Sequence, residues 1–469
     1  KVMASLSRQL SQWVADLEFK DLPPDVVDRA KGVTLQGLSS ALLGRDYPEV
    51  AQALDMMQIE EAGGGGAASV LVDGARLTKA GAALVNAEMM FAGGKWDTFR
   101  MLTHPGCAIL PAALVAAETA PDSNTVSGEL FITGVAAAYE VMERMAADFI
   151  PTIMARGFHS GPVFGIFGAA IAAAKIGGLN ADQIHGAIAQ CVNLASGNLE
   201  GGRSGGRSLR EGGAVRNALL AVAMARHGAP GGETVLEGEA GFYHAYIGNN
   251  LGKLTHSFTA DTSANLDDIT ANLGRDWVFL ETLYRIYYTP GYNIAHVDVT
   301  AALCAEHDIE PADVDRVVSI VNWLETEYPS PAFPSRTREA VVDNPQYYAA
   351  YGVVKRSFPL LNNAGRGIGE PDPPEVLDLM TRVTIVPSHR QPLFAPTVTI
   401  HLKDGRSVSK SATGQEFIWD FDTLAAKLQD IKPGLPISPD QYDALIADCA
   451  GLDKLPNAAV LIERTRAAK

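Results

Sequence analysis

The stretch 78–174 most narrowly limits what this chain can fold into, because it is rich in Ala, Gly and Met at helical spacing. Within it, residues 130–145 are apolar on most faces, which predicts a buried helix. Residues 164–176 carry Gly165, Gly168 and several alanines, and small side chains at this density let helix backbones approach closely. The sequence therefore predicts a closely packed helical core with the 164–176 helix at its centre.

Helix start and stop signals flank this core. Residues 4–45 predict two amphipathic helices separated by Pro23-Pro24, with Pro24 in the first turn of the second helix. Gly177-Gly178 ends the central helix, and Asn180 with Gln183 forms a capping box for the next one. A further Ala/Leu-rich helix is predicted over 214–227.

The pattern changes near residue 280. Segments 316–323 and 381–387 are β-branched and apolar, as in strands. Segments 397–403 and 407–412 flank Asp404-Gly405, which is a strong hairpin signal. Residues 416–468 return to a helical pattern. The predicted class is therefore mainly α, a large all-helical domain (1–278 and 413–469) with an inserted smaller α+β domain (279–412).

Composition excludes several function classes. The 469 residues are 47% hydrophobic and 20% charged, an ordinary globular balance. A net charge of −16 argues against nucleic-acid binding, which needs clustered Lys and Arg. No apolar run predicts a membrane span, and the N-terminus lacks the apolar core of a secretory signal. The four cysteines have no metal-binding spacing and indicate reduced thiols, so we expect a cytoplasmic protein.

The first candidate site is Asp97-Thr98 followed by His104-Pro105. It lies between two helical stretches, where a loop can present side chains to a cavity. An Asp, a hydroxyl and an imidazole together can bind a carboxylate and move a proton. The alternative is a helix cap at Asp97 or Thr98 with a structural histidine.

The second candidate is His159, in the segment Gly157-Phe158-His159-Ser160 just ahead of the central helix. A helix N-terminus disfavours an imidazolium and favours a bound anion. The alternative is a histidine satisfied by the local backbone.

The third candidate is the Gly/Arg-rich stretch 200–213, which contains Arg203, Arg207 and Arg210. Arginines bind carboxylates in a bidentate manner, and glycines let backbone N–H groups approach a ligand. The stretch lacks the Gly-Lys-Ser/Thr ending of a phosphate-binding loop. A flexible surface loop is the alternative, and the apolar segments on both sides weigh against it.

Two weaker candidates lie beyond the change near residue 280. Tyr292 and His296 can donate to developing negative charge, although a histidine at the start of a helix is more often structural. Tyr328 stands in a Pro-rich segment, where a tyrosine usually only packs.

These segments, in this order, resemble the MmgE/PrpD family from about residue 5 to 465. Further markers are the runs 109–113 (Ile-Leu-Pro-Ala-Ala) and 234–242. The resemblance implies a helical domain with an inserted α+β lid and a homodimer. It also implies no metal or organic cofactor, and a small di- or tricarboxylate as substrate.

Carried over by position, His104 and His159 match the family's active-site histidines, and Asp97 and Thr98 its Asp-Thr pair. His296 and Tyr328 match a histidine and a tyrosine of the lid region. This chain also departs from the family at several positions. Gly94 stands where an Asp is frequent, Arg207 and Arg210 replace a Lys and a His, and Tyr287 stands at a lid lysine.

These losses matter because an arginine stays charged and does not exchange a proton. Arg203, Arg207 and Arg210 are therefore expected to hold carboxylates, while the two histidines, Tyr292 or Tyr328 move protons. We expect a cofactor-independent hydro-lyase like the family's 2-methylcitrate dehydratase. A decarboxylase or an epimerase uses the same groups, and a catalytically diverged metabolite-binding protein is the alternative from another class.

Overall fold

The computed structural model describes residues 4–61, 65–121, 125–200, 209–287, 289–327, 344–358 and 371–468. This part of the chain is mainly helical, as predicted. It divides into two compact units. Unit 1 comprises Lys1–Leu254, Ser263–Tyr284 and Trp419–Lys469, and unit 2 comprises Thr255–Thr262 and Arg285–Ile418.

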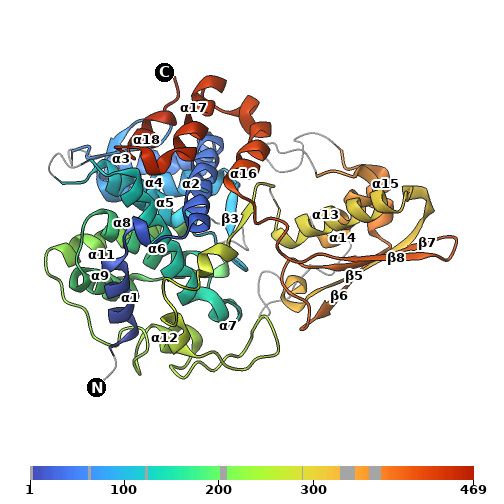
Figure 1. The fold of residues 1–469 in the computed structure, drawn as a ribbon, viewed down its shortest axis with the longest axis horizontal. Helices are drawn as coiled ribbons and strands as arrows, with labels where there is room; N and C mark the ends of the chain where they lie inside the picture. Colours follow the sequence, from blue (N-terminus) through green and yellow to red (C-terminus); the bar gives the residue numbers. More distant parts are fainter. Residues whose placement is uncertain are drawn as a thin grey trace. The chain divides into compact units, whose positions relative to one another are not determined.

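Unit 1 is built mainly from helices that pack against one another in several layers (Figure 1). Two short antiparallel strands, β1 (Ala68–Ser69) and β2 (Arg76–Leu77), pair beside them, and β3 (Trp96–Thr98) pairs with β4 (Leu283–Arg285). The described α-helices of unit 1 are α1 (Leu6–Asp16), α2 (Pro24–Gly44), α3 (Pro48–Glu60), α4 (Lys79–Ala92), α5 (Gly106–Glu118), α6 (Gly128–Ala146), α7 (Ile150–Ala155), α8 (Ser160–Ile176), α9 (Ala181–Leu194), α11 (Arg210–Arg226), α12 (Phe242–Ile247), α16 (Phe421–Leu428), α17 (Pro439–Ala450) and α18 (Val460–Arg464).

Helix α8 is the centre of unit 1, as its small residues predict. It packs against α5, α6, α9 and α11 (Figure 1). A methyl group at Gly165 would lie 3.1 Å from Ala108 Cβ, and one at Gly168 would lie 2.8 Å from Ile109 Cγ1. These two glycines therefore let α5 and α8 lie closer together than larger side chains would permit.

The local signals place most helix ends correctly. Pro24 is the first residue of α2, and Asn180 with Gln183 forms the capping box of α9. Two predicted starts are late, since α8 begins at Ser160 and α11 at Arg210. The extra first turns begin with Ser160 and Arg210, polar residues that an apolar pattern does not assign to a helix.

Unit 2 combines helices with one mixed sheet of strand order β6-β5-β7-β8. Strand β5 is parallel to β6 and antiparallel to β7, and the predicted hairpin of β7 and β8 is confirmed. Val317, Val398 and Ile400 of the sheet share a buried core with Val297, Leu303 and Tyr348 of the helices. The elements are α13 (Gly291–Glu306), β5 (Val314–Asn322), α14 (Pro345–Lys355), α15 (Pro374–Met380), β6 (Val383–Ser388), β7 (Thr397–Leu402) and β8 (Ser407–Ser411).

The boundaries of the two compact units differ from those of the predicted domains. Residues 279–284 belong to unit 1, where β4 pairs with β3. Thr255–Thr262 belongs to unit 2 although it is distant in sequence. The Trp323 indole donates to the Ser257 carbonyl at 2.9 Å, and the Asn322 amide donates to the Phe258 carbonyl at 2.9 Å. Such long-range bonds leave no local pattern in the sequence.

Candidate active site around two histidines

Asp97 lies on a short buried strand and not on a loop, which corrects the expectation for this segment. Strand β3 is buried at all three positions. Gly94 precedes it at φ +73°, a backbone conformation that Gly adopts freely and that Asp and Asn tolerate better than most residues. This position therefore suits Gly94, and it would also accept the Asp that the resemblance implies there.

The Asp97 carboxylate caps helix α5 from outside the helix. Its two oxygens accept the Gly106 N–H at 3.1 and 3.0 Å, and Oδ2 accepts the Tyr139 hydroxyl at 2.5 Å. Pro105, the N-cap residue of α5, makes no side-chain cap bond, so the carboxylate takes over that function. The observed role of this side chain is therefore to hold the start of α5.

His104 is oriented by the backbone of the same aspartate. Its Nδ1 lies 2.9 Å from the Asp97 carbonyl and 3.4 Å from Thr98 Oγ1. A carbonyl oxygen can only accept, so Nδ1 carries the proton and Nε2 of the neutral ring carries the lone pair. The ring packs against Trp96, with 4.6 Å between centroids. His104 is therefore held in the tautomer that can remove a proton through Nε2.

His159 is held in the opposite tautomer. It is the N-cap residue of α8, and its Nδ1 accepts the Gly161 N–H at 3.0 Å. In the neutral ring Nε2 therefore carries the proton. Burial, followed by the charge of Arg210 and by that of His104 when its ring is protonated, holds the pKa of His159 well below its usual value. The ring is thus a neutral donor, which is the form that stabilises a developing negative charge at a helix N-terminus.

A pair of hydroxyls joins the two histidine segments. Thr103 Oγ1 lies 2.8 Å from Ser160 Oγ, and the Met101 carbonyl lies 3.0 and 3.3 Å from these two oxygens. Because each hydroxyl has one proton, Thr103 donates to the nearer carbonyl and accepts the proton of Ser160. Arg100 and Leu102 on either side of Met101 have φ of +50° and +54°. Such values are uncommon for residues with a side chain and mark a strained loop. The loop before His104 is therefore held in an unfavourable conformation by the start of α8.

Arg210 completes the cluster from the first turn of α11. Its guanidinium lies over the Phe91 ring at 4.6 Å, and Phe91 stacks on Trp96 at 4.5 Å between centroids. Its Nε donates to the Glu211 carboxylate. These contacts fix the stem of the side chain and leave Nη1 and Nη2 without a hydrogen bond to any described residue. Such a guanidinium can bind a carboxylate of a ligand.

The candidates in unit 2 have a different environment. His296 is fully buried, with Nδ1 2.6 Å from the Tyr292 carbonyl and Nε2 2.7 Å from Ser319 Oγ. Burial lowers its pKa to about 4. Because both ring nitrogens are engaged, these contacts favour the structural alternative for His296. Tyr292 is buried on α13, and Tyr287 stacks on Phe358 at 4.1 Å. A catalytic role for Tyr292 and His296 stays a prediction.

Three predicted residues, Arg203, Arg207 and Tyr328, lie outside the described residues. Among the described residues, the structure brings together Asp97, Thr98, His104, His159 and Arg210.

Several buried polar residues at the cluster carry little or no signal in the sequence. Tyr139 lies within an apolar helical pattern, and only its contact with Asp97 reveals it. Glu88 and Glu211 are buried beside Arg210. Lys95 is also buried and directly precedes β3. Glu211 was detectable as a carboxylate next to Arg210, whereas the others carry no local signal.

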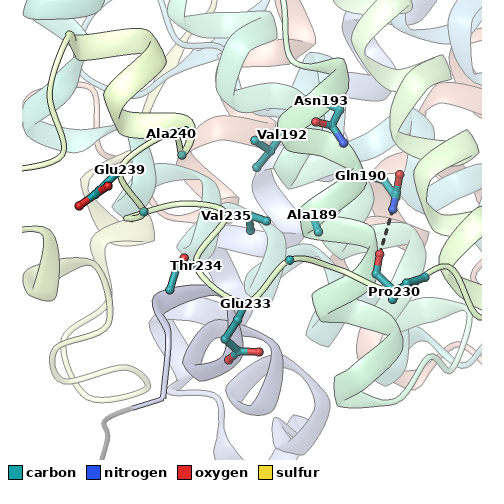
Figure 2. Close-up of a pocket in the computed structure, with 13 residues that line it drawn as sticks. Ala189, Gln190, Val192, Asn193, Pro230, Glu233, Thr234, Val235, Glu239 and Ala240 are labelled. Atoms are coloured by element: carbon teal, nitrogen blue, oxygen red, sulfur yellow. Dashed lines mark hydrogen bonds between the residues drawn. The ribbon is translucent and has the colours of Figure 1, made fainter.

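Other features of the described chain also bear on where a site can lie. Its residues include no group of three or more His, Cys, Asp or Glu placed to hold a metal ion. None of its helices has both the length and the apolarity of a membrane span. A surface pocket of about 370 Å³ lies between α9 and the 230–241 segment (Figure 2). Gln190 and Pro230 bond across its edge, and no predicted site residue lines it.

Comparison with known proteins identifies the family. Cis-aconitate decarboxylase of Aspergillus terreus is 24% identical over 98% of this chain and 96% of that protein. The human cis-aconitate decarboxylase is 25% identical over 98% and 94%. The cis-aconitate decarboxylase-like protein oryM of Aspergillus oryzae is 28% identical over 58% of this chain, and the match spans only 56% of that protein. Residues 8–254, more than half of the chain, match the MmgE/PrpD N-terminal domain, so this chain belongs to the MmgE/PrpD family.

Proposed function

We propose that this protein is a lyase that moves a proton next to a carboxylate of a small di- or tricarboxylate. The observation that carries the proposal is the pair of opposite tautomers at His104 and His159 beside the Arg210 guanidinium. The lone pair at His104 Nε2 serves as a general base, and the proton at His159 Nε2 serves as a donor. Arg210 binds a substrate carboxylate.

Decarboxylation of cis-aconitate is the first reaction to test. Two relatives that carry this activity in their names match nearly the whole chain, although at 24–25% identity. Loss of CO₂ leaves a carbanion, which the donor groups of the site stabilise until a proton is delivered to carbon. The arginine in place of the family lysine at Arg207 changes which groups are able to deliver that proton.

Dehydration is the second candidate, because the base and the donor are separate residues. A β-elimination needs one group to remove a proton from carbon and another to protonate the departing hydroxyl. His104 and His159 supply those two roles in their assigned tautomers. Epimerisation needs the same removal of a proton, followed by its return to the opposite face.

The α+β unit and the assembly belong to the same proposal. We propose that unit 2 serves as a lid, that Tyr292, His296 and Tyr328 contribute from it, and that Arg203 and Arg207 bind carboxylates with Arg210. We also propose a cytoplasmic homodimer without metal or cofactor. Size measurement by light scattering and metal analysis of the active protein test the last two points.

The deciding experiment is incubation of the purified protein with cis-aconitate, 2-methylcitrate, citrate and iminodisuccinate in D₂O, followed by NMR. Decarboxylation releases CO₂, dehydration converts a hydroxy acid to an alkene, and epimerisation introduces deuterium without loss of either group. The substitutions His104→Ala and His159→Ala should each lower the turnover rate by a factor of about 10² or more. Ligand-induced stabilisation without any turnover would instead identify a metabolite-binding protein.

A further inference from the structure

Two buried carboxyl groups flank Arg210 at the start of α11. Both oxygens of Glu211 accept from Arg210 Nε, at 2.9 and 3.0 Å. Glu88 reaches the same place from α4, where its Oε1 accepts the Gly212 N–H at 3.0 Å. Both glutamates are nearly inaccessible to solvent, with 5% exposure for Glu88 and 3% for Glu211. Neither of them is among the residues assigned to the reaction.

The two carboxyl groups are close enough for the charge of one to disfavour ionisation of the other. Glu88 bonds to the residue that directly follows Glu211, and a Cβ at Gly212 would lie 2.8 Å from Glu88 Oε1. Burial, followed by the charge of Glu211, raises the pKa of Glu88 to about 7. The Gly212 N–H and Arg210 lower this pKa, and Glu49 on α3 raises it. A buried carboxyl beside a carboxylate, as Glu88 is, keeps its proton until the pH is raised.

We propose that Glu88 and Glu211 are positioning residues for the Arg210 guanidinium, and that loss of the Glu88 proton weakens carboxylate binding as the pH rises. The inference rests on the proposed function, in which Arg210 binds a substrate carboxylate. With the proton in place, one carboxylate faces one guanidinium, and Arg210 Nη1 and Nη2 serve the ligand. When the proton leaves to solvent, two carboxylates surround the guanidinium, which then attracts a third carboxylate less strongly.

The test measures binding of tricarballylate, a saturated tricarboxylate, by isothermal titration calorimetry from pH 7 to pH 9. In the wild-type protein the Kd should rise about tenfold across this range, which is equivalent to about 1.4 kcal/mol. In Glu88→Gln the amide keeps an acceptor for Gly212 but has no proton to lose, so the Kd should stay constant. Glu211→Gln should weaken binding at every pH, because Arg210 loses the charge that anchors its Nε.

Glu118→Gln is the matched control. Glu118 ends α5, about 18 Å along the helix from Gly106, and its carboxylate bonds to Ser69 and Arg76. This variant removes the same charge and should retain the wild-type dependence of the Kd on pH. A general effect of net charge would change both variants alike and would overturn the proposal.

A second measurement needs no ligand. The free energy of unfolding of the wild-type protein should fall between pH 5 and pH 8 more steeply than that of Glu88→Gln, because only the wild type releases the Glu88 proton. Equal slopes would overturn the carboxyl pair whatever the ligand. Absence of tricarboxylate binding by the wild-type protein at every pH would overturn the proposed function, and with it the role of Arg210.

Discussion

Thr103 Oγ1 and Ser160 Oγ lie 2.8 Å apart, and each belongs to the residue next to one of the two histidines. The contact joins the strained loop before His104 to the first turn of α8. The separation of the two rings therefore depends on a bond between their neighbours as well as on the helices.

We expect Thr103→Val and Ser160→Ala each to destabilise the fold by about 1 kcal/mol, the usual contribution of a buried hydrogen bond. Turnover should fall more than this stability loss explains, because the His104 loop is released. The double variant should lose less stability than the sum of the losses in the two single variants, because both substitutions remove the same contact. Urea unfolding and steady-state kinetics measure the two effects, and full additivity would contradict a shared bond.

Tyr139→Phe should separate a positioning effect from a binding effect. The Tyr139 hydroxyl donates to the Asp97 carboxylate, and a buried bond to a charged group stabilises by roughly 1.5–3 kcal/mol. Because the Asp97 carbonyl orients His104, kcat should fall while KM changes little. A rise in KM with normal kcat would place Asp97 in substrate binding instead.

The acid stability of the protein should reflect His159. Its pKa is held below the usual value in the folded state, so the unfolded chain binds the proton more readily. Stability should therefore fall as the pH drops below about 6.5, where the unfolded histidine becomes protonated. In ¹⁵N NMR the His159 ring should stay neutral, with its proton on Nε2, throughout the range from pH 6.5 upward. Titration of this ring near pH 6.5 would contradict the assignment of a neutral donor.

The central glycines can be tested with a matched pair. A Cβ at Gly165 would lie 3.1 Å from Ala108 Cβ, an atom that is fixed to its backbone, whereas nothing lies within 4 Å of a Cβ at Gly213 in α11. Gly165→Ala should destabilise the protein by about 1 kcal/mol or more through overpacking. Gly213→Ala should stabilise it by about 0.5–1 kcal/mol through helix propensity. Thermal unfolding compares the two, and a gain for both would show that α5 and α8 can separate.

Unit 2 contains a buried carboxyl whose effect on stability has a defined sign. Burial raises the pKa of Glu325 to about 8, although it accepts the Phe394 N–H at 2.7 Å. The folded state therefore retains a proton that the unfolded chain releases near pH 4.5. The contribution of Glu325 to the free energy of unfolding is therefore fully present below pH 4.5 and is lost as the pH rises to about 8. Glu325→Gln should be more stable than the wild type at pH 9 by about 2 kcal/mol or more, and chemical unfolding at pH 5 and pH 9 measures the difference.

Much of the fold could be predicted because its signals are local. Asn180 and Gln183 start α9 through a capping box, Pro24 starts α2 because its fixed φ suits the first turn, and Asp404-Gly405 turns the hairpin. Each of these signals acts among near neighbours. The two histidine segments could also be found from local sequence. His104 follows Asp97-Thr98 and precedes Pro105, and His159 lies in Gly157-Phe158-His159-Ser160.

The support of the site could not be predicted because it is formed by tertiary contacts. Tyr139 meets Asp97 across 42 positions, and Glu88 meets Gly212 across 124. The tautomers of His104 and His159 depend on one carbonyl and one N–H that only the folded backbone supplies. Strand β3 was missed because its pairing partner, β4, lies far along the chain.

His104 and His159 stand just before two helices, α5 and α8, that pack directly on each other along Gly165 and Gly168. The packing of these two helices thereby sets the distance between the proposed base and the proposed donor, while Arg210 belongs to a third helix, α11. Under the proposed function, a change of the carboxylate-binding residues can therefore alter which substrate is bound while the geometry of proton transfer is kept. Arg207, where the resemblance implies a lysine, is a change of this kind.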